Sequence, residues 1–506
     1  MKNLLILTTY FFSTLFANTN TSETFSRDRL VEFYDVFLLE EKDILATVGL
    51  TTGSNTNNRD PFTPPPNPPP PPFKTNLLPV VLVNDSGLPD ADVYVLVTTG
   101  AETNGTQYWG SVNTSPGSNF GVVSYVTVSG QNGSTYTVSL SQLPVGSTGR
   151  VLYLPAISGG IIWFSMGSAL NMPSTGNAIT QPNFTNPTDP NYNINYDIFE
   201  LAYVPTGSPA VACDATAVSF FSIPLYGYLA GATSEASNTG LYQPRSYIMA
   251  QAAAMLNSTV ENAQWNKLLL QNGSTIVRLL STGKSISTTT EFDVNYLDNP
   301  GAYGYSYIGD IWDGGTSAYY HMNPLNITVT VTNPPANAGT WTYAGNVPTT
   351  GPNTGKLVFM AVTGGAPATM SFPVPSTSTT PPGTDSFQIF SGINFNSTAS
   401  PTAGDVNDAL SKLVQEAIIA GLLPTTNMVD LTYLADNQAN FYTVNSNLSS
   451  TGQSKGPWYD VYSKALHSLG SIYTYAFDEP LWPNVLLSSP FTNNQTYIGI
   501  TINSVQ

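Results

Sequence analysis

The sequence predicts a mainly β fold with a smaller inserted α/β portion. From residue 75 onward, short β-branched and aromatic runs alternate with turn residues, as in LPVVLV, NDSGLPD and ADVYVLV over residues 78–97. Only 9% of the 506 residues are charged, whereas soluble domains average about 25%. Few segments show helical spacing of apolar residues. Together these features favour an exported β protein over a helical cytosolic enzyme.

The first 17 residues, MKNLLILTTYFFSTLFA, have the organisation of a signal peptide. Lys2 supplies a positive charge, residues 4–16 form an apolar stretch that is short for a membrane span, and Ala17 is a small residue suited to cleavage. The alternative is an N-terminal membrane anchor. No later segment is long and apolar enough to cross a membrane, so we expect a secreted, extracellular protein without membrane contact after cleavage.

Residues 18–62 form an N-terminal extension, in which residues 28–46 place their apolar side chains on one helical stripe. This amphipathic helix would dock on the main body or on a partner. The run TPPPNPPPPP then occupies residues 63–72. Consecutive prolines favour polyproline II, which predicts a semi-rigid linker over residues 63–74. The main module would therefore span residues 75–506.

Within the module, strands are expected throughout the chain and helices only in places. The predicted strands are 78–83, 91–97, 121–128, 135–140, 150–154, 161–165, 196–204, 217–226, 326–332, 340–343, 356–362 and 495–504. Helical periodicity marks residues 245–256, 405–420 and 458–469, and a glycine follows the last two.

Charge and composition exclude several classes of function. The 32 acidic and 15 basic residues give a net charge of −17, which disfavours binding to nucleic acid or to anionic membranes. A neutral polysaccharide remains an acceptable partner.

The chain also lacks the residues that many enzyme classes need. Cys213 is the only cysteine, so no intramolecular disulfide can form, and we expect it to be a small buried apolar residue. His321 and His467 are too few for a zinc cluster, and no phosphate-binding loop or nucleophile elbow is present. We therefore predict no metal and no cofactor.

Glu200 is the candidate residue with the clearest chemistry. It lies in the otherwise nearly uncharged strand YDIFELAY, where alternation places it on one face with Tyr196 and Ile198. An acid in such a strand is either solvated in a cleft or paired. The alternative is an edge-strand acid that faces water.

Segments along the whole module resemble one family, glycoside hydrolase family 64. They share the family's order and are LLPVVLVNDSGLPDADVYVLV (77–97), TGRVLY (148–153), QPNFTNPTDPNYNINYDIFEL (181–201), PRSYIMAQAAA with WNKLLL and TIVRLLS (244–281), YLDNPGAYGYSYIGDIWD (296–313), DSFQIFSG (385–392) and YSKALHSLG with YTYAFDEP (462–480). The resemblance covers residues 75–506.

This resemblance implies a thaumatin-like antiparallel β-barrel or sandwich, with a wide groove between it and the α/β portion. It implies an inverting endo-β-1,3-glucanase that acts on β-1,3-glucan or a related neutral polysaccharide, and we expect the protein to be a monomer. Such enzymes use two carboxyl groups about 6.5–9.5 Å apart, one as general acid and one as general base. Glu200 matches the position of the general acid.

The position of the general base departs from the family. The family's aspartate falls on Ser219, which is a poor base without an activating partner. Asp214 takes the place of an asparagine, Thr216 keeps a threonine, and two polar positions after the glutamate become Ala202 and Val204.

Three explanations remain open. Another carboxylate could act as base: Asp214 is nearest, although an ideal strand would place it on the opposite face from Ser219, and Asp310 and Asp313 are more remote. The protein could instead be a weak or inactive enzyme that binds carbohydrate or another surface. Alternatively, the alignment across the loop 205–213 is wrong.

Two aromatic residues flank family-like segments and are the predicted sugar-stacking candidates. They are Trp163 and Trp312, although most aromatic residues of a β-rich protein belong to its core.

Overall fold

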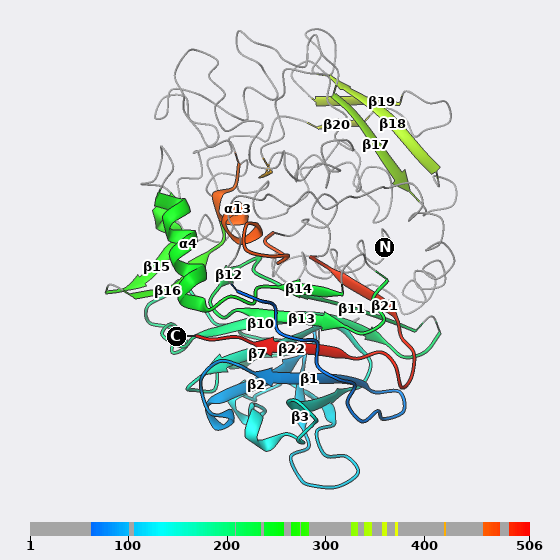
Figure 1. The fold of residues 1–506 in the computed structure, drawn as a ribbon, viewed down its shortest axis with the longest axis vertical. Coiled ribbons are helices and arrows are strands. Elements are labelled where there is room, and N and C mark those ends of the chain that lie inside the picture. The colour runs from blue at the N-terminus through cyan, green and yellow to red at the C-terminus, as the bar shows by residue number, and fades with distance from the viewer. Residues whose placement is uncertain are drawn as a thin grey trace.

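The computed structural model describes residues 62–100, 106–207, 209–233, 237–257, 265–273, 275–282, 325–331, 339–346, 357–361, 370–372, 419–420, 459–475 and 485–505. Two β-sheets dominate these residues and pack face to face (Figure 1). The first sheet has five strands in the order β14 (Asn238–Gly240), β13 (Leu225–Leu229), β22 (Ile498–Ile502), β1 (Leu78–Asn84) and β6 (Arg150–Leu154).

The second sheet has eight strands. Its path is β21 (Leu487–Pro490), β11 (Ala210–Ala215), β10 (Tyr196–Val204), β7 (Ile157–Met166), β2 (Val93–Thr98), β3 (Tyr108–Val112) and β4 (Val123–Thr127), and β5 (Val138–Ser139) also pairs with β2.

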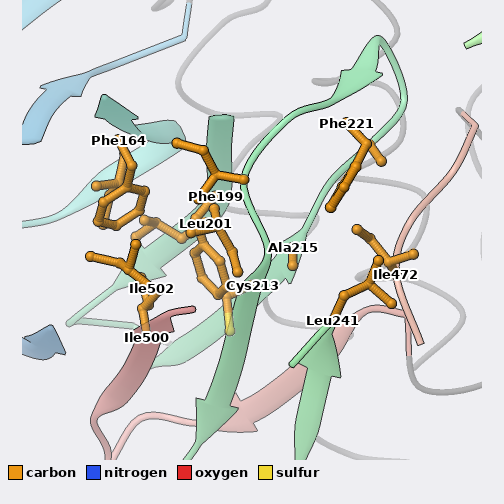
Figure 2. Packing of buried hydrophobic residues seen from close by; sticks show 14 of the residues in the cluster. Phe164, Phe199, Leu201, Cys213, Ala215, Phe221, Leu241, Ile472, Ile500 and Ile502 are labelled. Carbon is orange, nitrogen blue, oxygen red and sulfur yellow. The ribbon is translucent and has the colours of Figure 1, made fainter. Parts of the chain in front are cut away.

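The core lies between the two sheets. Because side chains alternate along a strand, every second residue of each sheet points into this layer. Ile500 and Ile502 of β22 face the side of the eight-stranded sheet that carries Phe164, Phe199 and Leu201, and all five are buried (Figure 2). Because the inner face of each strand fills this core, only the outer faces of the two sheets are available for a functional site.

Strand pairing is antiparallel throughout the two sheets except at the centre of the five-stranded one. There β1 and β22 run parallel, with Val81 opposite Gly499. The first and last strands of the described module are therefore neighbours in the interior of the same sheet (Figure 1).

The described residues also contain smaller sheets and helices. The remaining strands are β12 (Phe220–Phe221), β16 (Thr275–Leu280) and β15 (Leu269–Asn272) in one sheet, β17 (Leu325–Val331), β18 (Gly339–Asn346), β19 (Leu357–Ala361) and β20 (Met370–Phe372) in another, and the pair β8 (Ser174–Thr175) and β9 (Ala178–Ile179). The α-helices α4 (Arg245–Asn257) and α13 (Val461–His467) contact each other. Short 3-10 helices are η1 (Asp90–Asp92), η2 (Gly133–Thr135), η3 (Leu140–Gln142) and η4 (Asn266–Leu268).

The predicted mainly β class with antiparallel sheets is confirmed, apart from the parallel pair. Helices α4 and α13 confirm the helices predicted at 245–256 and 458–469. The helix predicted at 405–420 lies outside the described residues except for 419–420. The thaumatin-like topology and the wide groove stay predictions.

Strand β11 corrects the sequence analysis, which treated residues 205–213 as a loop. The turn is shorter and spans only residues 205–209, after which the apolar run from Ala210 to Cys213 pairs with β10. Pro205 and Pro209 both lie in the turn, and the run after them is fully buried and contains the β-branched Val211, which suits a strand.

The predicted semi-rigid linker packs against the module. Within residues 62–74, Pro68 and Pro71 are buried, so the segment is a docked strap. The predicted signal peptide and almost all of the predicted extension, residues 1–61, lie outside the described residues. Among the helices that the structure describes, none has the length and apolarity needed to cross a membrane.

A matched pair of substitutions tests the sandwich core. Val95 is fully buried between the sheets, whereas Val145 is 77% exposed. We expect Val95→Ala to lower the free energy of unfolding by about 2–3 kcal/mol, because two methyl groups and their contacts are lost. Val145→Ala should change it by less than about 0.5 kcal/mol. Urea denaturation followed by tryptophan fluorescence measures both, and equal effects would contradict the described core.

Candidate active site

Glu200 and Asp214 lie directly opposite each other on neighbouring strands. The hairpin β10–β11 turns at Gly207, whose φ of +80° suits glycine. Its antiparallel register pairs Phe199 with Ala215 and Glu200 with Asp214. The Cβ atoms of residues paired in this way are about 4.5–5.5 Å apart. The structure thus brings together the two carboxylates that the sequence analysis singled out at this end of the module.

Both carboxylates are on the outer face of the eight-stranded sheet. Their neighbours along the two strands, Phe199, Leu201 and Cys213, point into the sandwich core (Figure 2). Cys213 is a buried free thiol, as predicted.

The environment of Glu200 favours the protonated form. Glu200 and Asp214 are each only 1% exposed. Burial raises the pKa of Glu200 to about 8, since the charged form loses its solvation. Its Oε1 makes no hydrogen bond to a described residue. A second carboxyl group on the adjacent strand makes simultaneous ionisation of the pair still less favourable.

The neighbouring strand β7 supplies an apolar wall beside Glu200. Ile161 is its direct partner on that strand, and Trp163 lies two residues further along, opposite Ile198. Trp163 is buried, and its Nε1 donates a hydrogen bond to Oγ1 of Thr98 at 3.0 Å. The predicted stacking residue is therefore buried at a position diagonal to Glu200 in the strand register.

Ser219 and Thr216 follow β11 in the connection to β12. Because β11 ends at Ala215, the face of an ideal strand does not decide where Ser219 lies. Ser219 is buried, its carbonyl accepts the N–H of Ser281 at 3.1 Å, and its Oγ has no partner among the described residues. Thr216 forms a β-bridge with Tyr473. Both are held by the backbone, and neither is paired with Glu200 in the strand register.

Asp197 anchors the chain just after β12, and its role was missed in the sequence analysis. Its Oδ2 accepts the N–H groups of Ser222 and Ile223 at 2.8 and 2.9 Å, and Oδ1 accepts that of Ile198. Burial is the main cause that raises the pKa of Asp197 to about 7, against the opposing effect of these hydrogen bonds. A signal was available, since Asp197 is the only other acid in the strand that carries Glu200.

Arg278 is a second missed residue. This fully buried side chain on β16 lies over the rings of Tyr196 and Phe220, 4.6 and 5.4 Å from their centroids. It donates to the carbonyls of Tyr192 and Ile194 at 3.0 and 2.9 Å. Arg278 thereby ties β16 and β12 to the segment that leads into β10.

Several other candidates cannot be placed. Trp312, Asp310, Asp313 and His321 lie outside the described residues. His467 is buried at the end of α13, with Nε2 3.1 Å from the carbonyl oxygen of Ile472. No group of three potential metal ligands occurs in the described part of the chain.

The two paired carboxyl groups provide what acid–base chemistry requires, a proton donor and a second carboxyl group beside it. One group is protonated near neutral pH, and the other is its direct neighbour. Glycosidic bond cleavage needs such a proton donor together with a base or nucleophile.

Comparison with known proteins identifies the family. The family Glyco_hydro_64, described as "Beta-1,3-glucanase", matches residues 76–480. The crystal structure of a laminaripentaose-producing β-1,3-glucanase in complex with laminaritetraose is 18% identical, with a TM-score of 0.59, and the match covers 86% of this chain and 100% of that one. A β-1,3-glucanase domain (GH64) from Clostridium beijerinckii is 17% identical, with the same TM-score and coverage.

These two likenesses show a shared fold, and the comparison with curated proteins gave no match. The family match itself spans most of the chain. The protein therefore belongs to glycoside hydrolase family 64, the β-1,3-glucanases, and is a glycoside hydrolase of the glucan endo-1,3-β-glucosidase type.

Proposed function

We propose that the protein hydrolyses linear β-1,3-glucan with Glu200 as general acid and Asp214 as general base, with inversion at the anomeric carbon. The observation that carries this proposal is the direct cross-strand pairing of the two residues. This pairing supports Asp214, and not Ser219, as the general base. The relative that binds laminaritetraose supports a β-1,3-linked substrate.

In the proposed reaction each carboxyl group transfers one proton, because Glu200 gives one up and Asp214 takes one up. Glu200 donates its proton to the glycosidic oxygen, which leaves with the departing chain. Asp214 removes a proton from a water molecule that attacks the anomeric carbon from the opposite face. Burial supports the first role, because a pKa of about 8 keeps Glu200 protonated at neutral pH.

The stereochemical outcome depends on the separation of the two carboxyl groups. Inversion needs about 6.5–9.5 Å, which leaves room for water, whereas a separation of about 5–5.5 Å allows a carboxylate to attack as nucleophile. The Cβ atoms of a cross-strand pair are about 4.5–5.5 Å apart, so inversion requires the two side chains to diverge. Glutamate is one methylene longer than aspartate, which supports such divergence.

We further propose that the protein is secreted and acts outside the cell as a monomer. The signal-like residues 1–17 and the low content of charged residues support secretion. The net charge of −17 fits a neutral polymer better than an anionic one.

Substitution of the two carboxylates tests the assignment. Glu200→Gln and Asp214→Asn should each lower oligosaccharide release from linear β-1,3-glucan by about 10²–10⁴-fold, because each removes a proton transfer. Ser219→Ala should keep activity within about threefold, and Ser219→Asp should give no gain. Product release by the full chain is measured by chromatography.

Asp85→Asn, at an exposed position, is the matched control for amide substitution. Unchanged activity in Asp214→Asn would refute Asp214 as base. If the native chain releases no products but still binds glucan, hydrolysis itself is excluded and the protein is a carbohydrate-binding member of the family.

The pH profile tests the state of Glu200. Since only the protonated acid donates, we expect kcat/KM to be level near neutral pH and to fall as the pH rises through about 8. The fall should approach tenfold per pH unit above that value. An alkaline limb centred below pH 6 would contradict a buried, protonated Glu200.

The anomer released first tests the mechanism. Inversion of a β-linkage yields the α-anomer before mutarotation, and proton NMR of the earliest products distinguishes the two anomers. Initial β-anomer would mean that Asp214 acts as a nucleophile and that the proposal of inversion is wrong.

A further inference from the structure

The strap, residues 62–74 with the sequence FTPPPNPPPPPFK, meets the outer face of the five-stranded sheet with a period of three. Positions 62, 65, 68, 71 and 74 are buried or half-buried, and of the other positions only Phe73 is not exposed. Polyproline II has three residues per turn, so one edge of the helix faces the sheet. The contact between the strap and the sheet therefore has the three-residue period of polyproline II.

A notch in the sheet receives the strap. Gly499 of β22 lies between Val81 of β1 and Tyr228 of β13 in one cross-strand row. A Cβ atom on Gly499 would come within 2.4 Å of Cγ of Pro68. Only glycine leaves room for the proline ring at this position.

Two tyrosine hydroxyl groups bind the proline carbonyls. Tyr497 donates to the carbonyl of Pro68 at 2.6 Å, and Tyr153 donates to that of Pro72 at 2.9 Å. Proline has no N–H group, so its carbonyl is the only backbone partner it can offer. Burial raises the pKa of Tyr497 to about 12, which keeps this donor protonated.

The C-terminal end of the strap is secured by aromatic and cationic contacts. Phe73 meets the ring of Tyr497 edge-on at 6.4 Å between centroids. Lys74 lies 4.3 Å from the ring centroid of Tyr153 and donates to the carbonyl of Ser118 at 2.7 Å. Aromatic surfaces with hydroxyl donors are the means by which proteins recognise proline-rich peptides.

We infer that the outer face of the five-stranded sheet is a binding site for polyproline II segments, and that its occupant is the chain's own strap. The notch at Gly499 and the hydroxyl groups of Tyr153 and Tyr497 form this site. It lies on the opposite side of the sandwich from Glu200, and it does not depend on the proposed catalytic roles. The site fixes the strap to the last strand of the module.

This inference is tested with two variants of the full chain. Each variant replaces three prolines of the strap with glycine. The facing variant replaces Pro65, Pro68 and Pro71 with glycine, and the outward variant replaces Pro66, Pro69 and Pro70. A nitroxide label attached through Asn67→Cys reports strap mobility, because the only native cysteine, Cys213, is buried. We expect severalfold faster label motion in the facing variant alone. Equal motion in both variants would overturn the inference.

A synthetic peptide of residues 62–74 tests recognition directly. It should bind saturably to the facing variant, whose site is vacated, and should not bind to the native chain. Gly499→Leu added to the facing variant should abolish binding by filling the notch. Failure of the peptide to bind the folded facing variant, as judged by circular dichroism, would refute a polyproline site.

A conservative variant covers the case in which the facing variant does not fold. Tyr153→Phe with Tyr497→Phe removes only the two hydroxyl donors. In the labelled chain it should mobilise the strap, and an unchanged spectrum would show that the hydroxyl groups do not hold it.

Discussion

The alternation of side chains along β10 is the constraint on which both the core and the site depend. Phe199 and Leu201 must point inward to fill the space between the sheets, so Glu200 between them must point outward. The short turn at Gly207 then sets the register that places Asp214 opposite Glu200. A one-residue slip of this hairpin would expose the core and bury the carboxylates in it. Packing energy thereby enforces the geometry of the acidic pair.

Burying two carboxyl groups on adjacent strands opposes folding, and the surroundings show how the fold tolerates it. Glu200 is held protonated by its loss of solvation, beside the apolar wall of Ile161 and Trp163. The nearby connection is anchored separately, by Asp197 and its backbone N–H partners. The acid that anchors the backbone and the acid proposed as proton donor are therefore different residues of the same strand, and they face opposite sides of the sheet.

The two outer faces of the sandwich carry different chemistry. The eight-stranded sheet presents acids among apolar side chains, which suits bond cleavage in a neutral sugar polymer. The five-stranded sheet presents tyrosines around Gly499 and holds the proline strap. Since β22 is central in the latter sheet and pairs with β1, the strap, the first strand and the last strand stabilise one another. The N-terminal prolines are thus part of the module's packing.

The sequence alone predicted the β class, the helices α4 and α13 and the family, because these follow from local periodicity and ordered motifs, and it singled out Glu200 as the candidate acid. It did not reveal β11, so it named Asp214 only as the nearest alternative base and not as the cross-strand partner of Glu200, although a turn centred on Gly207 predicts that pairing. The contacts of Asp197, Arg278 and the strap were decided by tertiary structure. Each joins residues far apart in the chain, and no local pattern encodes which distant backbone group satisfies a buried charge or carbonyl.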